Sequence, residues 1–167
     1  MTHLSEFEHA FVQAASGNKP EKQYKFVIEF GLHCFTKAPN KKKKETLSDF
    51  PADLYYSDSR ETRIFCFDRH QLSFGLPEIA RSVANRQCFH TGKGNFFLIE
   101  FVDSNGEKEE YEVYFNVARS GKGLLRLFIE SAYVRDDEHE GSQPAKKKIN
   151  FFVIAHKVQN NQKITAP

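Results

Sequence analysis

An alternation of apolar and polar residues with a period of two begins at Lys22 and runs to Cys34. The polar face carries Lys25, Glu29 and His33. A period of two is that of a β-strand with one buried face. The pattern therefore predicts a long strand, whose apolar face comprises Tyr24, Phe26, Ile28, Phe30, Leu32 and Cys34.

Three apolar runs follow one another later in the chain: Phe96–Val102, Tyr111–Ala118 and Leu124–Val134. Asn105-Gly106 separates the first two, and Ser120–Gly123 separates the last two. Asn-Gly between apolar runs is a strong hairpin signal because both residues tolerate positive φ. The segment is therefore predicted to form a three-stranded antiparallel meander.

Helical spacing of apolar residues occurs in two other segments. Leu4, Phe7 and Phe11 predict an amphipathic helix over about residues 4–15, ended by the Ser-Gly-Asn sequence that follows. Leu76–Val83 predicts a second helix, with Pro77 in its first turn, where proline is tolerated.

The remaining segments are two short strands and three irregular stretches. The strands are expected at Arg63–Asp68 and Ile149–Ala155. Residues 37–61 have no period and predict a long loop, of the kind that is usually functional or disordered. Residues 136–148 are polar and rich in breakers, which predicts a solvated loop, and a loose tail is expected from about residue 159.

These elements predict one α+β domain over residues 1–167, with a curled antiparallel sheet of about five to six strands and two short helices. A chain of this length can bury a core without disulfides or a structural metal. The composition favours sheet, because seventeen Phe and no Trp make an aromatic core, and Phe packs well on a pleated surface.

Charge and targeting signals exclude several classes of protein. The net charge of +2 and the pI near 8.4 give no argument for a polyanionic partner, so the case for a nucleic-acid partner must rest on local patches of charge.

Met1 to Ala15 lacks the basic end and apolar run of a secretory signal, and no apolar run could cross a bilayer. Three widely spaced cysteines fit free thiols. We therefore expect a cytoplasmic protein with no membrane contact.

The first candidate site lies between the second helix and the meander, at Cys88–Asn95. Gly92 and Gly94 flank Lys93 there, which lets the backbone approach an anion, and His90 can exchange protons near neutral pH. The spacing of a Walker loop is absent. An ordinary glycine-rich connection explains the same residues, and both interpretations stay open.

The second candidate site is the end of the last meander strand. By alternation, Ser131, Tyr133 and Arg135 continue the face of Leu125, Leu127 and Ile129. An apolar face that turns polar is expected at a site on the rim of a sheet. A strand that simply leaves the core is the alternative.

The third candidate set is basic. Arg60, Arg63 and Arg69 lie around the second predicted strand, and Arg119 and Lys122 lie at the second turn of the meander. Lysine runs occur at Lys41–Lys44 and Lys146–Lys148. A groove that binds phosphate is one interpretation, and solvated charge is the other.

Thiol and imidazole groups are present, but their spacing does not favour a metal. Zinc requires three or four ligands that converge tetrahedrally. No Cys-x-x-Cys or His-x-x-x-His pair occurs, and neighbouring His33 and Cys34 face opposite sides of a strand. Buried structural cysteines are the commoner outcome, so we predict no metal and no cofactor. If a metal were bound, its ligands would come from Cys34, Cys66, Cys88 and His90.

Residues 90–135 combine a curled meander, His90 just before it, and a last strand that ends in Glu130-Ser131-Ala132-Tyr133-Val134-Arg135. In these features the segment resembles the small toxin ribonucleases grouped as barnase, EndoU, colicin and RelE-like. The resemblance implies RNA cleavage by transesterification without a metal. Under it, His90 would be the general acid or base. Lys93 and Arg135 would hold phosphate, while Ser131 and Tyr133 would position the substrate.

The sequence therefore predicts a domain that acts on RNA, in the form of a metal-independent ribonuclease from a toxin or phage-defence setting. The alternative is a non-catalytic module that binds protein or nucleic acid through an aromatic and basic sheet face. A protein partner that pairs with an exposed strand edge is a further expectation.

Overall fold

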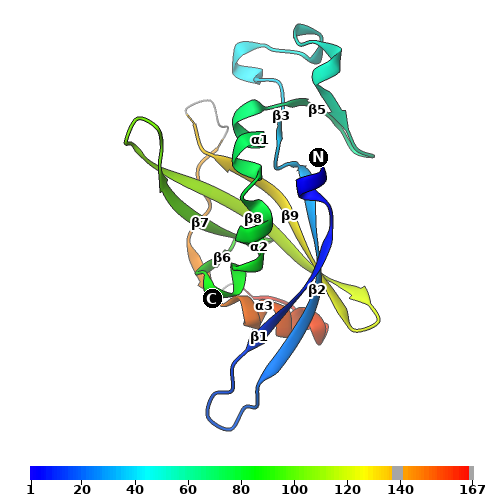
Figure 1. The fold of residues 1–167 in the computed structure, drawn as a ribbon, viewed down its shortest axis with the longest axis vertical. Helices are drawn as coiled ribbons and strands as arrows, with labels where there is room; N and C mark the ends of the chain where they lie inside the picture. The colour runs from blue at the N-terminus through cyan, green and yellow to red at the C-terminus, as the bar shows by residue number, and fades with distance from the viewer. Residues whose placement is uncertain (137–140, 166–167) are drawn as a thin grey trace.

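A seven-stranded sheet forms the centre of the protein, in the order β1-β2-β9-β8-β7-β6-β10, and a small sheet ordered β3-β5-β4 stands beyond one end of it (Figure 1). The computed structural model describes residues 1–136 and 141–165. The strands of the large sheet are β1 (Phe7–Gln13), β2 (Lys22–His33), β6 (Cys88–His90), β7 (Asn95–Val102), β8 (Lys108–Gly121), β9 (Leu124–Val134) and β10 (Lys147–Ile149). The small sheet comprises β3 (Thr36–Lys37), β4 (Tyr55–Ser57) and β5 (Thr62–Phe65). The helices are α1 (Phe67–Ser73), α2 (Leu76–Arg81) and α3 (Phe151–Gln159).

The α+β class is confirmed, but the sheet is larger than predicted and is mixed. Strands β2 and β9 run parallel, with Phe26 opposite Leu125 and Ile28 opposite Leu127. All other neighbours in the large sheet are antiparallel. Long stretches of chain separate β2 from β9, so no turn dictates their relative direction, and only the shared core decides it.

The predicted meander is confirmed as β7, β8 and β9, and in its first turn Gly106 has positive φ whereas Asn105 does not. Gly106 has φ of 81° in the first turn, and its N–H bonds to the carbonyl of Asp103 at 3.1 Å. The helix predicted at Leu76–Val83 is also present as α2.

The helix predicted over residues 4–15 is wrong, because Phe7–Gln13 forms strand β1. It pairs antiparallel with β2 along its whole length. Phe7 and Phe11 fit a period of four and also a period of two, so the spacing was ambiguous. Phe11 is 3% exposed and packs on Phe26 and Phe151, and this burial together with the ladder of β2 selects the strand.

The strand predicted at Ile149–Ala155 is also wrong, because most of it is helix α3. Asn150 caps the helix, since its side chain accepts a hydrogen bond of 2.8 Å from the N–H of Phe152. Helical spacing then buries Phe151, Ile154 and Ala155 together. Phe151 contacts Phe11, Phe26 and Phe115, and this aromatic contact fixes the helix on the sheet.

Several predicted loops contain more structure than expected. Residues 37–61 hold three short 3-10 turns and strand β4, and residues 67–73, most of which lie beyond the predicted strand, form α1. The predicted polar loop 136–148 ends in the first residues of β10, and its residues 137–140 lie outside the described part of the chain.

One face of the large sheet carries the main core. Helix α3 packs against β8 and β9 on that face, and the core includes Val113, Phe115 and Leu127. Side chains at the positions between these, such as Glu112 and Tyr114, therefore lie on the opposite face, which we call the outer face. The outer face holds the candidate site.

Candidate functional site

A β-bulge in β9 turns the end of that strand onto the outer face. Ile129 is opposite Phe115, whereas Ser131 is opposite Tyr114, so Glu130 is an extra residue in β9. Simple alternation from Ile129 is therefore broken. Ala132 joins the core in place of Ser131. The prediction that Ser131 shares a face with Leu125, Leu127 and Ile129 was wrong for this reason, although the polar end of the strand is real.

The bulge creates an open hollow on the outer face, which we call the outer hollow. It has a volume of about 170 Å³ and is lined by His33, Tyr114, Glu130, Ser131 and Tyr133. His33 and Ser131 are opposite each other on neighbouring strands. The rings of Tyr114 and Tyr133 stack with their centroids 5.8 Å apart and form one wall.

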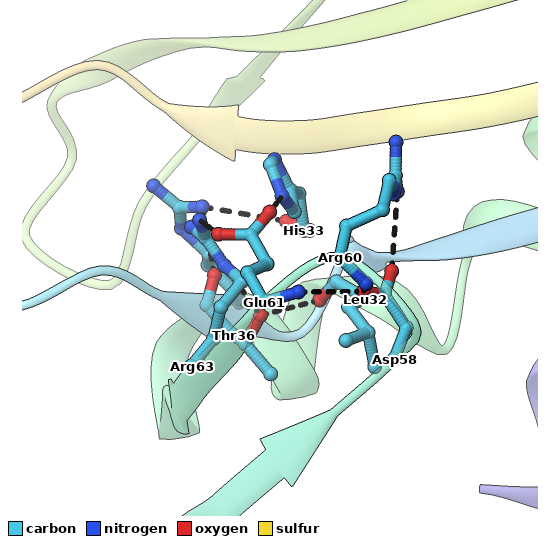
Figure 2. A network of polar contacts seen from close by, with 8 residues as sticks. Leu32, His33, Thr36, Asp58, Arg60, Glu61 and Arg63 are labelled. Atoms are coloured by element: carbon cyan, nitrogen blue, oxygen red, sulfur yellow. Dashed lines mark hydrogen bonds and ion pairs between the residues drawn. The ribbon is translucent and has the colours of Figure 1, made fainter. Parts of the chain in front are cut away.

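A polar network from the small sheet holds His33 in place (Figure 2). The Nε2 atom of His33 lies 2.6 Å from Oε1 of Glu61, and the second oxygen of that carboxylate accepts a bond of 3.1 Å from Arg63. The bond to His33 is the main reason why the pKa of Glu61 lies below its usual value. Among the described residues, Nδ1 of His33 has no hydrogen-bond partner, so that nitrogen is available to a ligand.

A second network lies beside Tyr133. Glu112 is 1% exposed, and its carboxylate accepts two bonds of 2.9 Å from Arg135, one of 2.7 Å from Tyr114 and one of 3.0 Å from Gln143. Arg135 also donates a bond of 3.3 Å to the hydroxyl of Tyr133. A buried carboxylate with this many donors fixes the guanidinium against the tyrosine pair.

Arg69 of α1 lies beside Tyr133 and the backbone of His33. It donates to the carbonyl oxygens of His33 at 3.3 Å and Thr36 at 2.9 Å, and its guanidinium lies 4.9 Å from the centre of the Tyr133 ring. Burial lowers the pKa of Arg69 and raises the pKa of Tyr133, so the phenol is protonated at neutral pH.

Three of the predicted site residues therefore come together: Ser131, Tyr133 and Arg135. His90 does not join them. It lies on β6, three strands from β9, which is about 14 Å at the usual strand spacing. It is 5% exposed, and its Nδ1 atom bonds to the side chain of Asn95 at 3.0 Å. Lys93 is exposed in the loop after β6 and does not line the outer hollow.

Arg119 and Lys122 also lie elsewhere. They belong to the β8–β9 turn, and Arg119 is opposite Leu125. Six residues of strand separate Leu125 from Ser131, which is about 20 Å.

The thiols form no visible reactive centre. Burial raises the pKa of Cys34 and of Cys88 to about 12, which keeps both thiols protonated. In the described part of the chain, no three His, Cys, Asp or Glu side chains gather closely enough to hold a metal ion.

Four residues of the site were missed by sequence reasoning or considered only for another role. His33 was weighed as a metal ligand and Arg69 as one of the basic residues around the second strand, whereas Glu61 and Glu112 carried no signal. Glu112 offered one indirect sign, since it is an acid in the middle of an apolar strand run. Two of its three hydrogen-bond partners, Arg135 and Gln143, lie 23 and 31 residues further along the chain.

Comparisons with known proteins identify the family without naming an activity. Among the described residues, no helix is long and apolar enough to cross a membrane, and the cytoplasmic location stays a prediction. No solved structure matches the chain. Protein YjaZ of Escherichia coli (strain K12) is 29% identical over 168 residues, which cover 100% of this chain and 88% of that protein. The model of the YjaZ family matches residues 1–159, and the chain therefore belongs to the YjaZ family.

Proposed function

We propose that the outer hollow is a site for metal-independent cleavage of RNA, with His33 in the role that the sequence suggested for His90. One observation carries the proposal: His33, oriented by Glu61, lines the same hollow as Ser131 and Tyr133. An imidazole oriented by a carboxylate beside hydroxyl groups is a common arrangement for moving protons.

In the proposed reaction, Nδ1 of His33 accepts the proton of the ribose 2′-OH. The 2′ oxygen then forms a bond to the adjacent phosphorus, and the bond from phosphorus to the 5′ oxygen breaks. The hydroxyl of Tyr133 gives its proton to the departing 5′ oxygen. Arg135 and Arg69, which both lie beside Tyr133, stabilise the phenolate left behind and the charge on phosphate. Ser131 positions the phosphate.

The test is incubation of total RNA in chelator with the wild type, His33→Asn, Tyr133→Phe and His90→Ala. Removal of a general acid or base costs about 10²- to 10⁴-fold in rate. We expect that loss for the first two variants and wild-type cleavage for His90→Ala, which serves as the matched histidine control. Loss in His90→Ala with full activity in His33→Asn would return the catalytic role to His90. Intact RNA with the wild type would refute the ribonuclease proposal.

A second candidate is a non-catalytic module, and an exposed aromatic surface favours it. Phe67, the first residue of α1, is 68% exposed, and Phe74, directly after the helix, is 56% exposed. His3 stacks on Phe74 with ring centroids 4.2 Å apart, and His70 lies 5.0 Å from the same ring. Aromatic rings on a surface can stack with the bases of single-stranded RNA.

This candidate is tested by the anisotropy of fluorescent single-stranded RNA. The module predicts binding by the wild type that is lost in the double variant Phe67→Ala/Phe74→Ala and kept in Val102→Ala, a control at another apolar side chain that is 62% exposed. Equal binding by all three proteins would remove this surface from consideration. The expected partner at a strand edge stays a prediction, and β1 is one edge of the large sheet.

A further inference from the structure

The β8–β9 turn and the end of α3 border two hollows that share Arg119, on the side of the molecule away from the small sheet (Figure 1). Their volumes are about 430 and 440 Å³, and Arg119 lines both. The first also includes Lys122 and Gln159, and the second includes Asn161 and Lys163. Together we call them the hairpin pocket. Its size is that of sites that hold a small organic molecule.

The pocket is positively charged without compensation. Arg119, Lys122 and Lys163 have no side-chain hydrogen bond or ion pair with any described residue, and no Asp or Glu lines either hollow. Two arginines near the outer hollow differ, since Arg63 and Arg135 each pair with a glutamate. Unpaired cations around a concave surface attract an anion.

The backbone of the turn holds Lys122 in a conformation that a lysine seldom adopts. Gly121 is opposite Leu124, so Lys122 and Gly123 form a two-residue turn, with φ of 48° and 78°. Asn or Gly occupies the first of these positions with less strain. Backbone strain of this kind is often found where a side chain has a function.

Capping of the last carbonyls of α3 is the simplest other role for these side chains. The carbonyls of the last turn already accept backbone bonds, however: His156 from the N–H of Asn160, Val158 from Asn161 and Lys157 from Gln162. None of the three cations bonds to these carbonyls. The end of the helix is therefore capped by its own backbone, which leaves the cations free for a ligand.

We propose that the hairpin pocket binds a phosphorylated small molecule. Arg119 would form a bidentate contact with phosphate, with Lys122 and Lys163 as point charges beside it. Leu124, Leu125 and Val158, which also line the hollows, would contact the organic part. The pocket lies about 20 Å from the outer hollow, so this inference is independent of the proposed ribonuclease activity.

Isothermal titration calorimetry with adenosine 5′-monophosphate, inorganic pyrophosphate and adenosine tests the proposal. We expect saturable binding of the monophosphate with a Kd below about 1 mM, and no binding of adenosine. Arg119→Gln and Lys163→Gln should each weaken binding about tenfold or more. Lys148→Gln, an exposed lysine on β10, is the control and should bind as the wild type does. Monophosphate binding tighter than that of pyrophosphate would show that the apolar wall contributes.

Lys122→Asn separates binding from folding. Asparagine suits the positive φ of the turn, so this variant should melt at the same temperature as the wild type or higher, while binding is weakened. No saturable binding by the wild type at about 10 mM ligand, or an equal loss in Lys148→Gln, would overturn the proposal.

Discussion

Replacement of Glu112 by Gln tests the account of the outer face. The side chain keeps its shape but loses its charge, and one of its two acceptor oxygens becomes an NH₂ donor. Arg135, whose side chain is 23% exposed, then has no carboxylate partner among the described residues. If the new NH₂ group stands at Oε1, the bond from the amide of Gln143 is lost, because two donors then face each other. If it stands at Oε2, the hydroxyl of Tyr114 must change from donor to acceptor.

The expected loss of stability is large for a single oxygen-to-nitrogen exchange. Removal of one partner of a buried ion pair costs about 3–5 kcal/mol, since the other charge is left uncompensated. Because Arg135 is partly solvated, we expect the lower end, about 3 kcal/mol. With a urea m-value of about 2 kcal/mol/M, the unfolding midpoint should fall by about 1.5 M.

Urea unfolding followed by circular dichroism measures this, and Glu29→Gln is the matched control. Glu29 also pairs with an arginine, with Nη2 of Arg126 at 2.5 Å, but these side chains are 29% and 37% exposed. A solvated pair of this kind contributes less than about 1 kcal/mol. If the two variants lose the same stability, burial of Glu112 does not increase the contribution of its ion pair to the free energy of unfolding.

The same variant should change the response to acid. Burial raises the pKa of Glu112, but the hydrogen bonds from Arg135, Tyr114 and Gln143 together lower it more, so it lies below its ordinary value of 4.5. Such a carboxylate contributes fully above its unfolded pKa, and the contribution is lost as the pH falls through the folded one. Between about pH 5 and pH 3, wild-type stability should therefore fall more steeply than that of Glu112→Gln. Parallel curves would contradict this.

Three further measurements test other parts of the structure. Gly31→Ala should destabilise the protein by about 1–3 kcal/mol, because the new Cβ would lie 2.9 Å from the backbone oxygen of Glu130. The control, Gly75→Ala, should be neutral or stabilising, since the nearest atom to its Cβ would be 3.5 Å away. Equal urea midpoints for the two variants would contradict the packing of β2 on β9. Tyr111→Phe should leave stability unchanged or raise it by about 1 kcal/mol, because the buried hydroxyl has no partner in the described structure, and a loss above that value would reveal one. Titration with a thiol reagent at pH 8 should label Cys66 first, since the other two cysteines are buried; rapid labelling of all three would argue against the core.

Local chemistry was enough to predict the elements whose ends are marked by turns. The meander follows from Asn105-Gly106 and from the glycines around Lys122, and the structure confirms both turns. Helix α2 follows from its apolar spacing and Pro77. In each of these elements the residues that decide the conformation lie within the segment itself, so no knowledge of distant partners is needed.

The N- and C-terminal elements could not be predicted in the same way. Phe7–Gln13 fits a helix or a strand, and β2 decides for the strand by offering a ladder. Phe151–Gln159 is apolar enough for either state, and the contacts of Phe151 with Phe11 and Phe115 decide for the helix. Propensity is a weak prior for short apolar segments, and burial overrides it.

The candidate site shows the same division. From sequence alone, Ser131, Tyr133 and Arg135 could be grouped, because two-residue spacing along one strand places them together. The bulge at Glu130 decides which face of the sheet these side chains occupy. Pairing between strands far apart in the chain decides which histidine and which carboxylates lie beside them. His33 replaces His90 beside them because β2 pairs with β9, whereas β6 lies three strands away. Local sequence determines which side chains one strand presents, and only long-range pairing decides which other strands bring their side chains to meet them.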